Sequence, residues 1–296
     1  MIEMKSSGQL SSAQTATLRD LGFGFGVFNS VITGMELCLL MWRRAYRYPH
    51  QQLVLFHFIA MFFYLLFTEV ILGYTLFSVD ISTPALCTTL GFLQQFTQSL
   101  FMLWEVCLII HQYFLFLWSP LDQPINLTAY HLLVWPASFF FSFLPMTTLD
   151  YDPRSGCWIS DSPMGLTWRV LTSYIPSLIY FSIIILSYLL IFRHHALASR
   201  NLTQVIDNRE KRPLRFLILY PLLFTLFYLP SVISGLYTVA THGVINFDLA
   251  VANIICQGLY ALVAVLIEEW VRIRPILEKI RMKIIGDRTS SSTEYL

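Results

Sequence analysis

The sequence contains few charged residues. Only 12% of its 296 residues are Asp, Glu, Lys or Arg, whereas 56% are hydrophobic. Soluble globular domains carry about 25% charged residues, so this composition excludes an ordinary soluble domain and predicts a multi-pass membrane protein. The formal net charge is only +1, so the overall charge points to no class of partner, and we expect no nucleic-acid partner.

Lysine is scarce. The four lysines are Lys5, Lys211, Lys279 and Lys283, and none lies in an apolar segment of spanning length. A retinal Schiff base needs a lysine inside such a segment, which excludes an opsin or a light-driven pump.

Catalytic and metal-binding motifs are also missing. The sequence has no His-Glu-x-x-His pattern and no phosphate-binding glycine loop, and its seven histidines show no metal-ligand spacing on a helix. We therefore expect neither an enzyme nor a bound metal or other cofactor. No internal repeat is visible, which gives an inverted-repeat transporter little support. The first twenty residues lack an apolar stretch, so we expect no cleavable signal peptide.

The sequence does contain apolar segments that are long enough to cross a lipid bilayer. There are seven, at about residues 21–42, 53–77, 87–118, 130–146, 168–192, 214–239 and 247–271. We therefore expect an all-α membrane protein, with a seven-transmembrane helix bundle over residues 21–272. Residues 1–20 form an N-terminal segment and residues 273–296 a tail. Residues 276–286 mix apolar with basic side chains, which predicts a short amphipathic helix on the membrane surface.

Basic residues are distributed unevenly between the two sides of this bundle. Fifteen of the nineteen Lys and Arg residues fall in the loop after the first segment, in the loop after the fifth, or in the tail. The positive-inside rule then predicts an extracellular N-terminus and a cytoplasmic tail. Seven spans agree with this topology, because an odd number places the two termini on opposite sides.

Two of the five cysteines fall on the predicted outer side. Cys87 begins the third segment, and Cys157 lies in the second outer loop. Disulfides persist in the oxidising environment outside the cell. We predict a Cys87–Cys157 disulfide that holds this loop over the mouth of the bundle; the alternative is two free thiols.

Four short motifs, taken in order, resemble those of one receptor family. They are Gly156-Cys157-Trp158-Ile159, Tyr174-Ile175-Pro176, Leu219-Tyr220-Pro221-Leu222 and Gln257-Gly258-Leu259. With the seven segments and the cysteine pair, the chain is similar to the cyclic-AMP chemoattractant receptor-like family of G-protein-coupled receptors and to its secretin and adhesion relatives. The resemblance covers about residues 21–285. It implies an extracellular small-molecule ligand and a cytoplasmic heterotrimeric G protein.

Three departures from receptor motifs are visible. The inner end of the third segment reads His111-Gln112-Tyr113 where rhodopsin-like receptors have Asp-Arg-Tyr. The seventh segment ends with Glu268-Glu269-Trp270 and lacks Asn-Pro-x-x-Tyr. Leu103-Trp104-Glu105 stands where the cyclic-AMP-like receptors usually have Leu-Trp-Thr. We therefore do not place the chain in the rhodopsin-like class, and cyclic AMP does not follow as its ligand.

Three acidic residues interrupt the apolar segments: Glu36, Glu69 and Glu105. Carboxyl groups are unfavourable in lipid and usually face the bundle interior or a water-filled pocket. One interpretation is a polar network that changes between two receptor states. The other is a set of static contacts between helices or, for Glu36, a side chain that reaches the membrane interface.

The expected ligand site lies at the outer mouth of the bundle, because the short N-terminal segment offers no domain to capture a ligand. Candidate ligand contacts are Gln94, Gln95, Gln98, Trp168, Arg169 and Tyr228. The three glutamines can share one face of the third segment at helical spacing. In the alternative interpretation, the glutamines bond to neighbouring helices and Arg169 extends to lipid headgroups.

The expected G-protein surface combines the inner end of the third segment with the basic stretch before the sixth. Its candidate residues are His111, Gln112, Tyr113, Arg209, Lys211 and Arg212. In the tail, Ser290, Ser291 and Ser292 are candidate phosphorylation sites for a receptor kinase, and an arrestin would bind the added charge. The alternatives are a solvated interfacial histidine and an unmodified tail.

Together these patterns predict a G-protein-coupled receptor in the plasma membrane. Pro221 and Pro230 offer a bend in the sixth segment, because proline removes a backbone hydrogen bond. The alternative is a seven-helix proton-coupled transporter in which Glu36, Glu69 and Glu105 carry protons.

Overall fold

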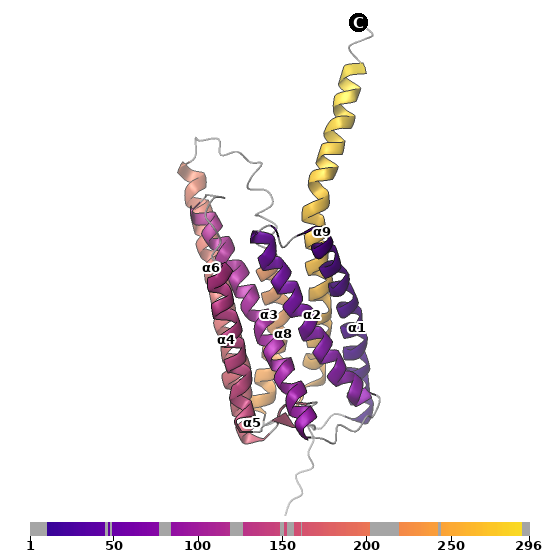
Figure 1. Cartoon of the computed structure of the whole chain (residues 1–296), viewed down its shortest axis with the longest axis vertical. Coiled ribbons are helices and arrows are strands. Elements are labelled where there is room, and N and C mark those ends of the chain that lie inside the picture. Colours follow the sequence, from indigo (N-terminus) through magenta and orange to yellow (C-terminus); the bar gives the residue numbers. More distant parts are fainter. Residues whose placement is uncertain are drawn as a thin grey trace, which may run out of the picture.

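The computed structural model describes residues 11–44, 47, 49–76, 84–118, 127–148, 151–152, 157–160, 162–201, 219–241 and 244–291. Within these residues, seven helical segments are long and apolar enough to cross a membrane. They pack side by side into one elongated bundle (Figure 1). The chain is therefore an all-α seven-helix bundle of the multi-pass membrane type, as the apolar segments predict.

The spans follow one another along the chain, and the fifth is built from three consecutive helical pieces. The elements are α1 (Ser12–Trp42), α2 (Pro49–Leu76), α3 (Pro84–Trp118), α4 (Leu127–Met146), α5 (Pro163–Arg169), the π-helical turn η3 (Val170–Tyr174), α6 (Ile175–Asn201), α8 (Leu219–Ala240) and α9 (Phe247–Ser291). Two short strands, β1 (Tyr151–Asp152) and β2 (Trp158–Ile159), pair antiparallel before α5.

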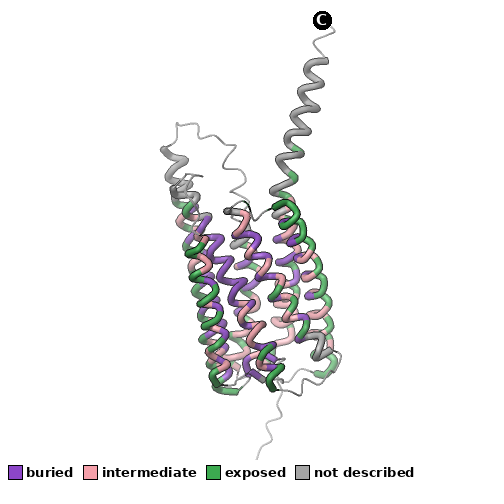
Figure 2. Tube along the Cα trace, in the orientation of Figure 1, coloured by how far each residue is buried: buried purple, intermediate pink, exposed green. Residues whose placement is uncertain are grey.

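The third span lies at the centre of the bundle. α3 contacts α2, α4, α6, α8 and both strands. Of its spanning window, 72% is buried, against 17–44% in the other six spans. Figure 2 shows the buried residues gathered on the helices inside the bundle. This confirms that the segment with the glutamines and Glu105 is surrounded by protein rather than lipid.

Aromatic side chains fill the middle of the bundle. The ring of Phe101 in α3 lies 5.6 Å from Phe224, 5.4 Å from Tyr228 and 5.9 Å from Tyr260, measured between centroids. Tyr64 of α2 stacks against Phe101 at 6.0 Å. Aromatic pairs at these distances add to the stabilisation from buried area. The cluster therefore packs α2, α3, α8 and α9 against one another.

The two ends of the bundle differ. At one end, a disulfide joins Cys87 in α3 to Cys157 beside β2. Both strands lie at this end (Figure 1), which we call the disulfide end. At the other, the tail end, α9 projects beyond the other helices, and Arg43 Nη1 lies 2.7 Å from Glu269 Oε1. The disulfide predicted from the sequence is thus present in the structure.

The C-terminal part of the chain differs from expectation. The sequence predicts a short separate surface helix at residues 276–286, but α9 runs without interruption from Phe247 to Ser291. The expected boundary at Arg274-Pro275 is wrong, because a proline inside a helix removes only one backbone hydrogen bond and need not end it. The backbone is helical on both sides of residue 275.

The first helix begins earlier than its apolar segment. Ser11 caps α1: its hydroxyl accepts a hydrogen bond from Gln14 N at 3.2 Å, and Gln14 Oε1 accepts one from Ser11 N at 3.0 Å. This reciprocal capping box satisfies backbone donors that the first helical turn leaves free. The helix therefore starts at Ser12, nine residues before the expected start at residue 21.

Candidate functional site

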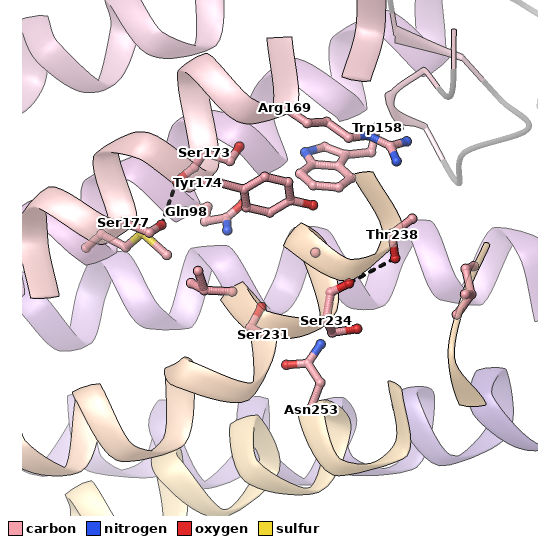
Figure 3. Close-up of a pocket in the computed structure, with 14 residues that line it drawn as sticks. Gln98, Trp158, Arg169, Ser173, Tyr174, Ser177, Ser231, Ser234, Thr238 and Asn253 are labelled. Atoms are coloured by element: carbon pink, nitrogen blue, oxygen red, sulfur yellow. Dashed lines mark hydrogen bonds between the residues drawn. The ribbon is translucent and has the colours of Figure 1, made fainter. Parts of the chain in front are cut away.

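A polar cavity lies at the disulfide end of the described part of the chain. Its volume is about 260 Å³, and residues from α3, the fifth span, α8 and α9 line it together with Trp158 of β2. The lining residues are Gln98, Met102, Trp158, Arg169, Ser173, Tyr174, Ser177, Ser231, Val232, Ser234, Gly235, Thr238, Ile245 and Asn253. Figure 3 shows Ser231, Ser234 and Asn253 facing Gln98 and Tyr174 across the space. We call it the disulfide-end cavity.

The chemistry of this lining is dominated by neutral hydrogen-bonding groups. Five serine and threonine hydroxyls, two carboxamides and the Tyr174 hydroxyl line it, while the single charged side chain is the guanidinium of Arg169. No acidic residue is among the described residues of the wall. The ring faces of Trp158 and Tyr174 supply flat apolar surface. Convergent polar groups with a few aromatic faces are typical of small-molecule sites.

Arg169 is held against the strand rather than extended to a membrane interface. It is 6% exposed. Its Nε and Nη2 atoms both donate hydrogen bonds to the Ile159 carbonyl oxygen, at 2.9 Å for Nε. Its guanidinium carbon also lies 4.8 Å from the centre of the Trp158 ring, a cation–π contact. The residue thus joins α5 to β2 and keeps a positive charge in the cavity wall.

Gln95 lies behind the cavity wall and positions it. The side chain is 1% exposed. Its Oε1 accepts a 3.0 Å hydrogen bond from Trp158 Nε1, and its Nε2 donates to Thr172 O at 3.3 Å and to Ser173 Oγ at 3.1 Å. Thr172 and Ser173 belong to η3, a π-helical turn of the kind that often marks functional sites. One amide group therefore fixes the strand, the central helix and this turn together.

Some of the remaining predicted ligand contacts line the cavity and others do not. Gln98 lines the cavity, whereas Gln94 does not, and its buried Oε1 has no hydrogen-bond partner among the described residues. Trp168 lies outside the cavity and donates from Nε1 to Thr148 Oγ1 at 3.0 Å. Tyr228 lies on α8, one turn before Ser231 and Val232, and is 3% exposed. Of the six candidates, the structure thus brings Gln98 and Arg169 to the cavity.

Several lining residues were not predicted. Trp158 follows the disulfide cysteine, Ser177 lies on α6, Ser234 and Thr238 lie on α8, and Asn253 lies on α9. Serine and threonine are common in membrane helices, where they bond to their own backbone. Thr238 Oγ1, for example, donates to Ser234 O at 2.9 Å. Their sequence pattern therefore carries no signal of the cavity, which arises only when the helices pack.

A second polar cluster joins three helices deeper in the bundle. Glu105 Oε2 of α3 lies 3.1 Å from His57 Nδ1 of α2 and 3.4 Å from the Tyr260 hydroxyl of α9. That hydroxyl also lies 3.3 Å from His57 Nε2. His57 and Glu105 are fully buried, and Tyr260 is 2% exposed. We call these three residues the buried triad. Glu105 was predicted from the sequence, whereas His57 and Tyr260 were not.

The other two intramembrane acids lie in different surroundings. Glu69 on α2 is 7% exposed and lines a separate cavity against α1. Glu36 on α1 is 1% exposed. All three acids are thus buried within the bundle, and Glu105 forms the triad described above.

Packed side chains connect the disulfide-end cavity with the buried triad. Met102 lines the cavity and accepts a 3.5 Å hydrogen bond at Sδ from Ser177 Oγ. Phe101, its neighbour on α3, lies 5.1 Å from the His57 ring and 5.9 Å from the Tyr260 ring. Tyr228 contacts Phe101 from α8 at 5.4 Å. A change in packing at the cavity therefore acts on atoms that contact the triad.

The part of the predicted G-protein surface that the structure describes lies on α3. His111 is buried near the tail end of α3, and Tyr113 packs against the core. Gln112 is helical, but its side chain lies outside the described part. Four further candidates lie outside the described residues: Arg209, Lys211, Arg212 and Ser292. Ser290 and Ser291 are helical in backbone at the end of α9.

Comparison with known proteins found no relative: no family model and no curated protein matches the chain. The family resemblance therefore rests on the sequence motifs and their order.

Proposed function

We propose that the chain is a G-protein-coupled receptor of the plasma membrane, with its disulfide end outside and its tail end facing a heterotrimeric G protein. The observation that carries this proposal is the disulfide-end cavity. Its wall is shared by α3, the fifth span, α8 and α9. A ligand there contacts four helices at once, so it stabilises whichever packing of those helices fits it better.

The packing between cavity and triad supports signal transmission along the bundle. The Phe101 cluster and the buried triad join α2, α3, α8 and α9. Pro230 stands inside α8 between Tyr228 and Ser231, where the backbone lacks one hydrogen bond and bends more readily. Allosteric coupling requires two sites and an element with two packings that both sites influence. We assign that element to α8 and its contacts with Phe101.

The experiment uses the full chain in lipid nanodiscs with a purified heterotrimeric G protein. Metabolites, cyclic nucleotides and lipids are screened for compounds that accelerate guanine-nucleotide exchange. Ser234→Phe fills the cavity, and we expect it to abolish the response. Ser182→Phe is the matched control because Ser182 is exposed on α6 outside the cavity, and we expect it to respond normally. If neither basal nor ligand-driven exchange is seen with any G-protein class, the receptor assignment fails.

The alternative function is proton-coupled transport, which the His57–Glu105 contact favours. The carboxyl group of Glu105 on α3 and the imidazole of His57 on α2 lie 3.1 Å apart within the bundle, and such a pair can exchange a proton. Chain reconstituted in liposomes with an internal pH dye tests this directly. Substrate-dependent proton flux that Glu105→Gln abolishes would favour the transporter, whereas nucleotide exchange without flux would favour the receptor.

A further inference from the structure

The lining of the disulfide-end cavity also indicates the chemical class of its ligand. Within the described part of the chain, no hydrogen bond uses the side chains of four lining residues: Gln98, Ser231, Ser234 and Asn253. The Oδ1 atom of Asn253 is moreover buried without a partner there. Buried polar groups normally have hydrogen-bond partners. These four side chains are therefore available to a molecule in the cavity.

The four side chains lie on opposite walls, and each both donates and accepts hydrogen bonds. Gln98 belongs to α3. Across the space from it lie Ser231 and Ser234 of α8 and Asn253 of α9 (Figure 3). A ligand that bonds to both walls carries several groups that themselves donate and accept, distributed around its rim. Hydroxyl groups on a ring meet this requirement, whereas a single polar head group reaches only one wall.

The charge of the wall disfavours ionic ligands. No carboxylate stands among the described lining residues to balance an ammonium group, and the Arg169 guanidinium would repel one. The guanidinium does not point its donors at an anion either, because Nε and Nη2 both donate to the Ile159 carbonyl oxygen. Its carbon lies 4.8 Å from the centre of the Trp158 ring. The groups that converge on the space are thus neutral, and they fit an uncharged ligand.

Gly235 of α8 gives the cavity part of its aromatic surface. A Cβ atom at this position would overlap the ring of Tyr174. Glycine thus allows the Tyr174 ring to approach the α8 backbone, and Trp158 adds a second ring to the lining. The face of an aromatic ring is partly negative, so it attracts the weakly positive hydrogens of C–H groups. An aliphatic ring that presents axial C–H bonds packs well on such a surface.

Volume limits the ligand to a single ring. The 260 Å³ of the cavity is less than the roughly 300–1,000 Å³ of sites for drug-sized molecules. At about 30 Å³ per water molecule it holds the volume of about nine waters, which suits one ring with five or six hydroxyls. We propose that the disulfide-end cavity binds a neutral monocyclic polyol of the pyranose or cyclitol type. This inference rests on the proposed function, because it names the ligand class of the receptor site.

The proposed contacts follow from the two kinds of wall. Hydroxyls of the polyol bond to Gln98 on one side and to Ser231 and Asn253 on the other. The C–H face of its ring packs on Trp158 and Tyr174. Both kinds of contact are lost when the ligand is replaced by water, which forms hydrogen bonds but offers no C–H face.

Binding to the purified full chain in nanodiscs, without any G protein, tests the ligand class separately from the receptor function. The neutral probes are glucose, galactose and myo-inositol, used at up to ~50 mM because small neutral ligands often bind only in the millimolar range. Glucosamine and glucuronate are matched probes that add one positive or one negative charge to glucose, and adenosine is a planar probe. Saturation-transfer NMR detects binding through the ring protons of the probe.

We expect at least one neutral polyol to bind. At ten times its Kd it should raise the midpoint of thermal unfolding by about 2–4 °C, because it binds the folded state only. It should bind about tenfold more tightly than its charged counterparts, since the wall offers them no counter-charge directed into the space.

Variants locate the binding in the cavity. Asn253→Leu keeps the approximate size of the side chain and removes its hydrogen bonds, so polyol binding should weaken about tenfold. Gln257→Leu is the matched control: it makes a similar change one turn along α9, outside this cavity, and should bind normally. Gly235→Ala displaces the Tyr174 ring and should also weaken binding. Ser231→Ala is a milder change that keeps the test decisive if Asn253→Leu folds poorly.

Three outcomes would overturn the proposal: no polyol binds, Asn253→Leu and Gln257→Leu weaken binding equally, or a charged or planar probe binds more tightly than every neutral polyol. Failure of the proposed function looks different. A polyol that binds in the cavity but drives no nucleotide exchange with any G-protein class supports the ligand class and contradicts the receptor. Exchange driven by another compound, without polyol binding, contradicts the ligand class alone.

Discussion

Trp158 Nε1 donates a 3.0 Å hydrogen bond to Gln95 Oε1, which joins the strand after the disulfide cysteine to the central helix of the bundle. Because Gln95 also bonds to Thr172 and Ser173, the second outer loop and the π-helical turn share one anchor. The wall of the disulfide-end cavity depends on this single buried amide.

Gln95→Leu should therefore destabilise the folded chain. The change keeps the approximate size of the side chain but leaves the Trp158 indole N–H and the Ser173 hydroxyl without this partner. We expect the free energy of unfolding to fall by about 2–3 kcal/mol. Thermal unfolding in detergent measures the effect. Trp168→Phe removes a more exposed hydrogen bond to Thr148 and should change stability by under about 0.5 kcal/mol. Equal destabilisation by both variants would contradict the anchoring role of Gln95.

Loss of the disulfide should reduce the amount of folded protein at the cell surface. Cys87 and Cys157 are 70 residues apart, and closing such a loop contributes about 3–5 kcal/mol in the chain-entropy model. Cys87→Ser and Cys157→Ser should each lower surface expression, and the double variant should match either single one. Mass mapping of surface-labelled protein checks the bond itself, and two free thiols there would refute it.

Gly91→Ala should disturb the same end of the molecule by a steric effect. A Cβ atom at Gly91 would overlap the Tyr151 ring and the Cys157 carbonyl oxygen. Burial raises the pKa of Tyr151, whose neutral hydroxyl donates to Ser142 O at 3.0 Å. We expect a loss of about 1–3 kcal/mol, as for other overpacked sites. Gly24→Ala is the control: no atom lies within 4 Å of its added Cβ, so its unfolding midpoint should stay equal or rise.

Tyr260→Phe should change signalling more than it changes folding. It removes a hydroxyl that contacts both His57 and Glu105 and leaves the aromatic packing in place. If the buried triad stabilises the resting packing, basal nucleotide exchange should rise severalfold, because a neutral hydrogen bond contributes about 0.5–1.5 kcal/mol. Tyr237→Phe, at an exposed position of α8, is the matched control. Unchanged basal exchange in Tyr260→Phe at normal expression would show that the triad does not stabilise the resting packing.

The fold follows closely from the sequence, whereas the site follows only in part. Long apolar segments predict all seven spans because lipid permits few other backbone structures. The start of α1 was missed, although Ser11 and Gln14 stand at capping-box spacing. In contrast, the π-helical turn at Val170–Tyr174 has no sequence signature, and it places Ser173 against Gln95. Asn253 and Ser234 were missed because their polarity becomes meaningful only when α8 and α9 pack beside α3.

The unbroken course of α9 turns a small rotation into a large displacement. Asn253 lies in the cavity wall, and Ser291 ends the same helix. At 1.5 Å per residue the two positions are about 57 Å apart along the axis. If α9 moved as a rigid rod, a tilt of about 5° at the cavity would move the far end by about 5 Å, close to the height of one helical turn. A ligand that binds in the disulfide-end cavity, as proposed, would therefore touch the same helix whose other end projects beyond the tail end of the bundle.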